Sequence, residues 1–195
     1  MKLVNDSECI KAKLKEYSPK LSGKRLKPIA NHNNDKIDIL KNIFSSETTS
    51  TNDKTQAILD LSDEFRNQDN VSKHAVCQNG CAYCCKIPVS VTALEAILIG
   101  SIINKRPKEL NEIKRSTEKD CYCPFLDQKK ANCSIYKVRP LHCRNFHSLD
   151  HYKYCNQINK THLIFTTASS DRLKALEEIL IQGSQGRIED IRDWF

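Results

Sequence analysis

Glycine is scarce in this chain of 195 residues, which contains five glycines, no two of them adjacent. Loops that bind phosphates or dinucleotides need closely spaced glycines, so the sequence excludes that class of nucleotide site. The sequence also contains neither a metalloprotease helix motif nor a hydrolase elbow. No common catalytic motif is therefore visible, and whether the protein is an enzyme stays open at this point.

Long apolar runs are missing as well. The longest stretch, Ala93 to Ile103, is interrupted by Glu95 and is shorter than the roughly 20 apolar residues that a membrane-spanning helix needs. The first residues, Met-Lys-Leu-Val-Asn-Asp-Ser-Glu, contain no apolar core of a secretion signal. Mean hydropathy is −0.56 and 28% of the residues are charged. We therefore expect a cytoplasmic protein that does not contact a membrane.

Cysteine, in contrast, is abundant. Nine of the ten cysteines lie between Cys77 and Cys155, in less than half of the chain. In a reducing compartment, clustered thiols hold a metal more often than they form disulfides. Scattered small hydrophobic cysteines would not be concentrated in this way, so the composition indicates a metal site.

The formal net charge of +7 raises the question of a nucleic-acid partner. Much of this charge lies near the N-terminus, on Lys11, Lys13, Lys15, Lys20, Lys24, Arg25 and Lys27. Basic residues that bind single-stranded nucleic acid are interleaved with aromatic residues, whereas this segment contains only Tyr17. A solvated basic arm is the favoured interpretation, and nucleic-acid binding is the alternative.

Apolar residues at helical spacing predict a mainly α fold: a small helical domain with metal-stapled, cysteine-rich loops. Helices are predicted at 37–44, from 52 or 53 through 65, and at 107–113. A Thr92–Glu95 capping box opens a further helix, and Ser170 caps another that ends before Gly183. A last short turn is predicted within 187–195, where Trp194 docks on the body of the protein. Strand signal is limited to 163–167. We expect residues 1–50 to form a basic, partly flexible segment and 51–195 a cysteine-cluster domain with its motif core at 77–155.

The first cysteine group is Cys77-Gln-Asn-Gly-Cys81-Ala-Tyr-Cys84-Cys85. Cysteines two or three residues apart can turn their sulfurs toward one ion, and Gly80 permits the tight turn between them. Soft thiolate ligands suit zinc and iron–sulfur iron. The spacing also matches that of radical-SAM enzymes, but the repeated strands and the glycine-rich segment of those enzymes are missing, so we reject that interpretation.

The second group completes a resemblance to a known family. Its motifs are Cys123-Pro-Phe-Leu126, Cys133-Ser-Ile-Tyr136, Arg139-Pro140, Cys143-Arg144 and Cys155. Together with the first group, in this order, they resemble the CxxCxxCC family of zinc- or iron-chelating domains over residues 77–155. The flanks, residues 1–70 and 160–195, carry no part of the resemblance.

The resemblance implies eight metal ligands: Cys77, Cys81, Cys84, Cys85, Cys123, Cys133, Cys143 and Cys155. Cys9 and Cys121 are extra cysteines and are left out of this set. The implied cofactor is an iron–sulfur cluster, such as 4Fe-4S, or Zn²⁺, in a protein of metal handling or an accessory redox protein that has a protein partner. A related pattern in flagellin lysine-N-methylase suggests an iron–sulfur enzyme as the alternative. A zinc-stapled module that binds nucleic acid or protein is the third hypothesis.

Two observations favour an iron–sulfur cluster over zinc. Eight cysteines exceed the four that one tetrahedral zinc takes. Adjacent Cys84 and Cys85 are expected to project in different directions, which suits a polynuclear cluster or two nearby sites better than one ion.

Other polar residues in the second group have open roles. If 143–155 were helical, Cys143, His147, His151 and Cys155 would share one face, but we expect the histidines to lie on a solvated turn rather than to bind metal. Arg139 and Arg144 are expected either to neutralise thiolate charge or to pair with a carboxylate. Tyr136 is expected to pack in the core.

Overall fold

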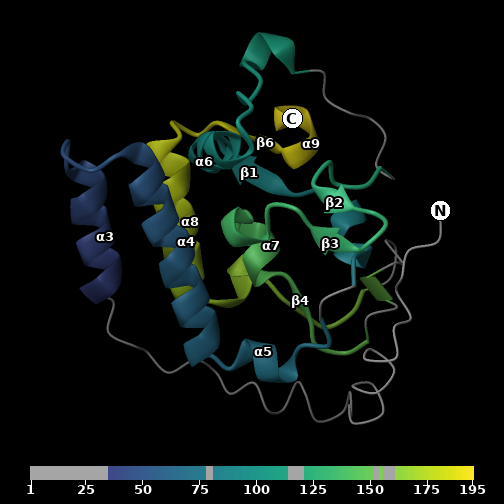
Figure 1. Cartoon of the computed structure of the whole chain (residues 1–195). Coiled ribbons are helices and arrows are strands. Elements are labelled where there is room, and N and C mark those ends of the chain that lie inside the picture. The colour runs from purple at the N-terminus through teal and green to yellow at the C-terminus, as the bar shows by residue number, and fades with distance from the viewer. Residues whose placement is uncertain (1–34, 78–80, 114–120, 152–153, 156–160) are drawn as a thin grey trace.

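The computed structural model describes residues 35–77, 81–113, 121–151, 154–155 and 161–195 (Figure 1). Its helices are α3 Asp35–Ser45, α4 Thr51–Gln68, α5 Val71–His74, α6 Ala93–Ile103, α7 Leu141–Asn145, α8 Asp171–Gly183 and α9 Ile191–Trp194. Its strands are β1 Ser90–Thr92, β2 Leu126–Asp127, β3 Asn132–Cys133, β4 His147–Ser148, β5 Ile164–Phe165 and β6 Ile188–Asp190. They form three antiparallel pairs, β1 with β6, β2 with β3 and β4 with β5. The mainly α fold class is confirmed.

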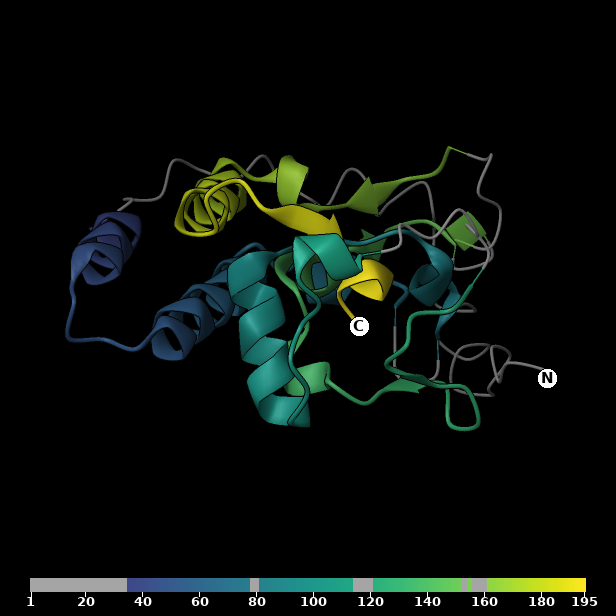
Figure 2. The same cartoon turned by 90° about the horizontal axis from the view of Figure 1, so that it is seen from above.

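Helices α3, α4 and α8 lie together on one side of the molecule, and the short strands β2, β3 and β4 lie on the other (Figures 1 and 2). The Ser50 side chain accepts a hydrogen bond from the Asp53 amide and so starts α4. Ile58 and Leu59 of α4 are completely buried, as are Leu173 and Leu176 of α8. This helical layer forms most of the core and supports the cysteine-rich segments beside it.

The predicted capping box is present at the start of α6. The Thr92 side chain accepts from the Glu95 amide, and the Glu95 carboxylate accepts from the Thr92 amide at 2.8 Å. The same carboxylate, only 2% exposed, accepts from the Leu141 amide at 2.7 Å. Glu95 therefore does more than cap α6, because it also fixes the start of α7, which carries Cys143.

The large apolar residues of α6 are not all buried. Leu94 and Leu98 are buried, but Ile97 is 46% and Ile102 is 63% exposed. The helix is apolar nearly all round, so periodicity alone does not identify the side that packs on α4.

The C-terminal segment docks as predicted. Trp194 of α9 is 1% exposed and donates its indole N–H to the Val91 carbonyl at 2.9 Å. The preceding strand β6 pairs with β1, Val91 opposite Glu189, although sequence analysis predicted neither strand. The predicted helix 107–113 is reduced to a 3₁₀ turn at Leu110–Glu112. No helix within the described segments has both the length and the apolar character to cross a bilayer.

The segment from Cys143 to Cys155 is not one helix. Helix α7 ends at Asn145, Phe146 is extended with φ −84° and ψ 108°, and the chain continues into β4. The condition under which Cys143, His147, His151 and Cys155 would share one helical face is therefore not met. The break allows His147 to pair in register with Phe165 of β5, a contact that no local pattern encodes.

The basic arm, Cys9 and Gly80 lie outside the described residues. The proposed division at residue 50 stays a prediction. Helix α3 lies before that division and packs against α4 and α8.

Candidate metal centre

One cavity of about 700 Å³ brings the predicted cysteines together. All eight line it: Cys77, Cys81, Cys84, Cys85, Cys123, Cys133, Cys143 and Cys155. Cys121 does not line it, although only one residue separates Cys121 from Cys123. All nine cysteines of the described segments are reduced. Cysteines up to 78 positions apart in the sequence thus line one cavity. Cys121, which is not part of the predicted ligand set, does not line it.

Cys77 is held against strand β4. The Val76 amide donates to the Ser148 carbonyl at 2.9 Å, and the Ser148 amide donates to Cys77 Sγ at 3.2 Å. The Ser148 side chain also forms a hydrogen bond to the buried thiol of Cys155. One serine therefore joins the first cysteine of the pattern to the last.

A 3₁₀ turn at Tyr83–Lys86 carries the cysteine doublet. The thiols of Cys84 and Cys85 form a hydrogen bond with each other, so the expectation that they project in different directions is wrong. The tight turn brings both sulfurs to the same cavity.

The two cysteine groups are joined directly through the backbone. The Cys123 amide donates to the Cys85 carbonyl at 2.8 Å. Cys133 then follows through the β2–β3 hairpin, in which it lies opposite Leu126. This hairpin places two cysteines ten positions apart on one wall of the cavity.

Three of the thiols share one local geometry. Cys81, Cys123 and Cys133 each accept a hydrogen bond from the backbone N–H two residues later. Such a bond stabilises the thiolate form, which is the form that binds metal. The local backbone is therefore arranged for thiolates, even though the thiols of the metal-free chain are protonated.

Burial keeps these thiols protonated at neutral pH. It raises the pKa of Cys81 and of Cys123 to about 11 and that of Cys155 to about 12, and repulsion from neighbouring thiolates adds to the effect. Burial also raises the pKa of Cys143. A metal ion must therefore displace protons when it binds, and its charge replaces theirs in the cavity.

The eight cysteines are chemically suited to a thiophilic metal, but their present arrangement is too open to bind one. Among the residues that the structure describes, no group of three or more His, Cys, Asp or Glu side chains is arranged so that it could hold a metal ion as it stands. The thiols line the walls of a cavity that is much wider than one ion. Metal binding would consequently have to draw them inward.

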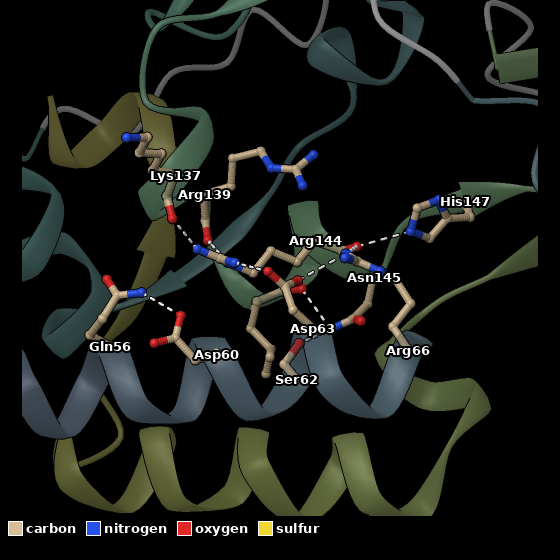
Figure 3. Close-up of polar contacts among 11 residues, drawn as sticks. Gln56, Asp60, Ser62, Asp63, Arg66, Lys137, Arg139, Arg144, Asn145 and His147 are labelled. Atoms are coloured by element: carbon tan, nitrogen blue, oxygen red, sulfur yellow. Dashed lines mark hydrogen bonds and ion pairs between the residues drawn. The ribbon is translucent and has the colours of Figure 1, made fainter. Parts of the chain in front are cut away.

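Arg144 organises the wall behind the cysteines (Figure 3). Its guanidinium, only 3% exposed, pairs with Asp63 of α4 and donates to the carbonyl oxygens of Lys137 and Arg139. Its own carbonyl accepts from Arg66 at 2.7 Å. The structural pairing that we considered for the two arginines is thus correct for Arg144, which joins α4 to the Arg139-Pro140 segment.

Arg139 has the other role that sequence analysis considered. It lines the cavity. Burial raises the pKa of Cys133 and Cys143, and the hydrogen bond to Cys85 together with burial raises the pKa of Cys84; the positive charge of Arg139 offsets part of each rise. Its guanidinium stacks on the Tyr136 ring at 3.8 Å. Tyr136 is 62% exposed, so its predicted place in the core is wrong, because the ring covers the arginine from the solvent side.

Arg192 of α9 was missed by sequence analysis. Its guanidinium donates to the Cys85 carbonyl at 3.1 Å and to the Cys121 carbonyl at 3.1 Å, and it pairs with Asp190 at 2.9 Å. It thereby joins the backbones of the two cysteine groups. No local motif marks it, because it lies more than 30 residues after the last cysteine.

Replacing Arg144 by alanine is expected to destabilise the metal-free protein by about 3 kcal/mol or more. The substitution removes the partner of Asp63 and leaves two backbone carbonyls without their donor. The exposed Arg106 is the matched control, because water and salt screen its surface pairs with Glu109 and Glu112, which therefore contribute little to stability. Guanidinium-induced unfolding of both variants measures the difference. Equal, small losses would contradict the role of Arg144.

Comparison with known families gives one match. Residues 76–163 match the CxxCxxCC family model, which is described as "Putative zinc- or iron-chelating domain". The match supports the resemblance that the cysteine motifs indicated. A search of curated proteins and a search of solved structures each found no match. The matched segment includes all eight cavity cysteines, whereas helices α3, α4 and α8 and residue Arg192 lie outside it.

Proposed function

We propose that this protein uses its CxxCxxCC domain to hold iron, as an iron–sulfur cluster, on the eight cavity cysteines. The observation that carries the proposal is that all eight family cysteines line one cavity and Cys121 does not. The family supports binding of zinc or iron in general. Thiolates from loops far apart in sequence would then close around the metal and staple those loops together.

The size of the cavity supports a cluster over a single ion. An ion takes roughly the space of one water molecule, about 30 Å³, whereas the cavity measures about 700 Å³. Eight thiols exceed the four that one tetrahedral zinc uses and also the four that one iron–sulfur cluster uses, so their number allows two sites of either kind. Two zinc ions are the competing arrangement, and they would leave much of the cavity to other molecules.

An enzyme is the second candidate function, supported by the same volume. Small-molecule sites measure about 300–1,000 Å³ and combine apolar walls with a few polar groups. Apolar residues such as Ile87, Leu126 and Phe146 line this cavity beside the cysteines. A bound cluster would supply one-electron transfer, and Arg139 would hold an anionic group near it. Nothing in the described residues singles out lysine methylation among such reactions.

The first experiment is to purify the full chain without oxygen and measure its absorption spectrum with its content of iron, zinc and acid-labile sulfide. We expect a brown protein with iron and sulfide in comparable amounts. A colourless protein with two zinc ions per chain would replace the iron–sulfur proposal by a zinc-stapled module. Protein without any metal after reconstitution would contradict metal binding altogether.

A further inference from the structure

His147 lines the cysteine cavity, and its imidazole points toward the backbone carbonyl of Arg144 (Figure 3). Its Nε2 lies 3.0 Å from the Arg144 carbonyl oxygen. A carbonyl oxygen only accepts, so Nε2 must carry the proton and donate. Burial lowers the pKa of His147 to about 4, so the ring is neutral at physiological pH. Nδ1 therefore presents a lone pair.

That lone pair is buried without a partner. Within the part of the chain that the structure describes, Nδ1 makes no hydrogen bond, although it is shielded from solvent. A buried acceptor left unpaired costs roughly 1–3 kcal/mol, so an orphan of this kind calls for a ligand that is not part of the polypeptide. None of the described cavity thiols donates a hydrogen bond to it.

The residue next to His147 contacts the first and the last cysteine of the pattern, Cys77 and Cys155. Ser148, the next residue, donates its amide to Cys77 Sγ and bonds through its side chain to the Cys155 thiol. Arg66 donates to the same Arg144 carbonyl as His147 and carries a positive charge that disfavours protonation of the ring. The group that meets Nδ1 is thus a Lewis acid or a neutral donor rather than a proton from bulk water.

We propose that His147 is a metal ligand through Nδ1, which gives the cavity one nitrogen donor among its thiolates. The inference rests on the proposed metal-binding function and adds a ligand outside the family's cysteine pattern. Histidines that ligate metals usually donate their other ring N–H to a backbone carbonyl or a carboxylate, as Nε2 of His147 does toward Arg144. Zinc accepts mixed cysteine and histidine sets, and histidine ligands raise the potential of iron–sulfur centres.

Isotopic labelling of the full-length chain tests the proposal without a substitution. The protein is labelled with ¹⁵N-histidine and loaded anaerobically with iron and sulfide. Pulsed electron paramagnetic resonance of the reduced form then measures couplings to nitrogen. We expect the strong coupling of a directly bonded histidine nitrogen. If the protein takes up zinc instead, Co²⁺ replaces it and the same coupling is measured on the cobalt.

Two substitutions identify the histidine. His147→Gln is expected to abolish the coupling, and His147→Cys to abolish it while keeping the metal content, because a thiolate takes the same position. His142→Gln is the matched control, since His142 lines the same cavity but pairs its Nε2 with Glu177 at 2.9 Å. The control should keep the full coupling.

The role of His147 and the proposed metal-binding function are overturned by different results. Metal-loaded wild-type protein without a strong histidine coupling, or a coupling that survives in His147→Gln, would overturn the role of His147 alone. Wild-type protein that binds no metal would overturn the proposed function and the inference with it.

Discussion

Replacing Cys84 by serine is expected to lower metal affinity by more than about 100-fold, because even residues that only orient ligands contribute 10–100-fold. The Cys84 thiol interacts electrostatically with those of Cys81, Cys133, Cys143 and Cys155, and so lies between the two cysteine groups. Its loss would remove the donor shared by both groups. Metal per chain after gel filtration against a chelator, together with the melting temperature, measures the effect. Cys81→Ser should act in the same direction.

Cys121→Ser is the matched control for this experiment. Cys121 lies outside the cavity lining, and its backbone carbonyl rather than its thiol accepts from Arg192. Serine leaves that carbonyl in place, so metal content and melting should stay at wild-type values. Full metal content in Cys84→Ser with unchanged melting would contradict the proposed centre, and an equal loss in both variants would show that the cavity does not select the ligands.

Removal of the metal is expected to make the fold sensitive to alkali. In the metal-free chain, burial holds the pKa of Cys81 and Cys123 at about 11 and that of Cys155 at about 12, above the ordinary value of 9.0. Below pH 9 the thiols are protonated in both the folded and the unfolded state, and no stability is lost. As pH rises from about 9 to 12, the unfolded chain releases protons first, so the free energy of unfolding falls by several kcal/mol.

The metal-loaded chain should not show this fall, because its cysteines already bind as thiolates. Urea unfolding of chelator-treated and loaded protein at pH 7.5, 9 and 10.5 compares the two states. A second consequence has the opposite sign: binding releases protons, so metal affinity should weaken as pH falls below 7.5. If stability did not depend on pH in the metal-free protein, the buried thiols would have to be solvated in solution.

The helices could be read from the sequence because their signals are local. Periodic apolar residues predicted α4 and α8, and the Thr92–Glu95 capping box predicted the start of α6. Local patterns failed where the burial was decided by a distant partner. Ile97 and Ile102 of α6 and Tyr136 are exposed. An apolar residue type alone does not tell which side of a segment packs against a neighbouring element.

The eight candidate ligands were also predictable, because each belongs to a spacing motif and their order matches one family. What the sequence could not predict is that their thiols line the same cavity. That depends on contacts such as Cys123 with Cys85 and Ser148 with Cys77, between residues 38 and 71 positions apart. Their role as ligands stays a proposal that the metal analysis tests.

The sequence by itself determined the helical character, the cysteine motifs and their chemistry, because propensity, capping and ligand softness are properties of residues and their near neighbours. Only the tertiary structure decided that Arg144 is a structural hub, that Arg192 joins both cysteine groups and that His147 presents a buried lone pair. Each of these roles is set by hydrogen bonds to backbone carbonyls. Because every residue carries the same carbonyl, no side-chain pattern in the sequence marks where such a bond will form.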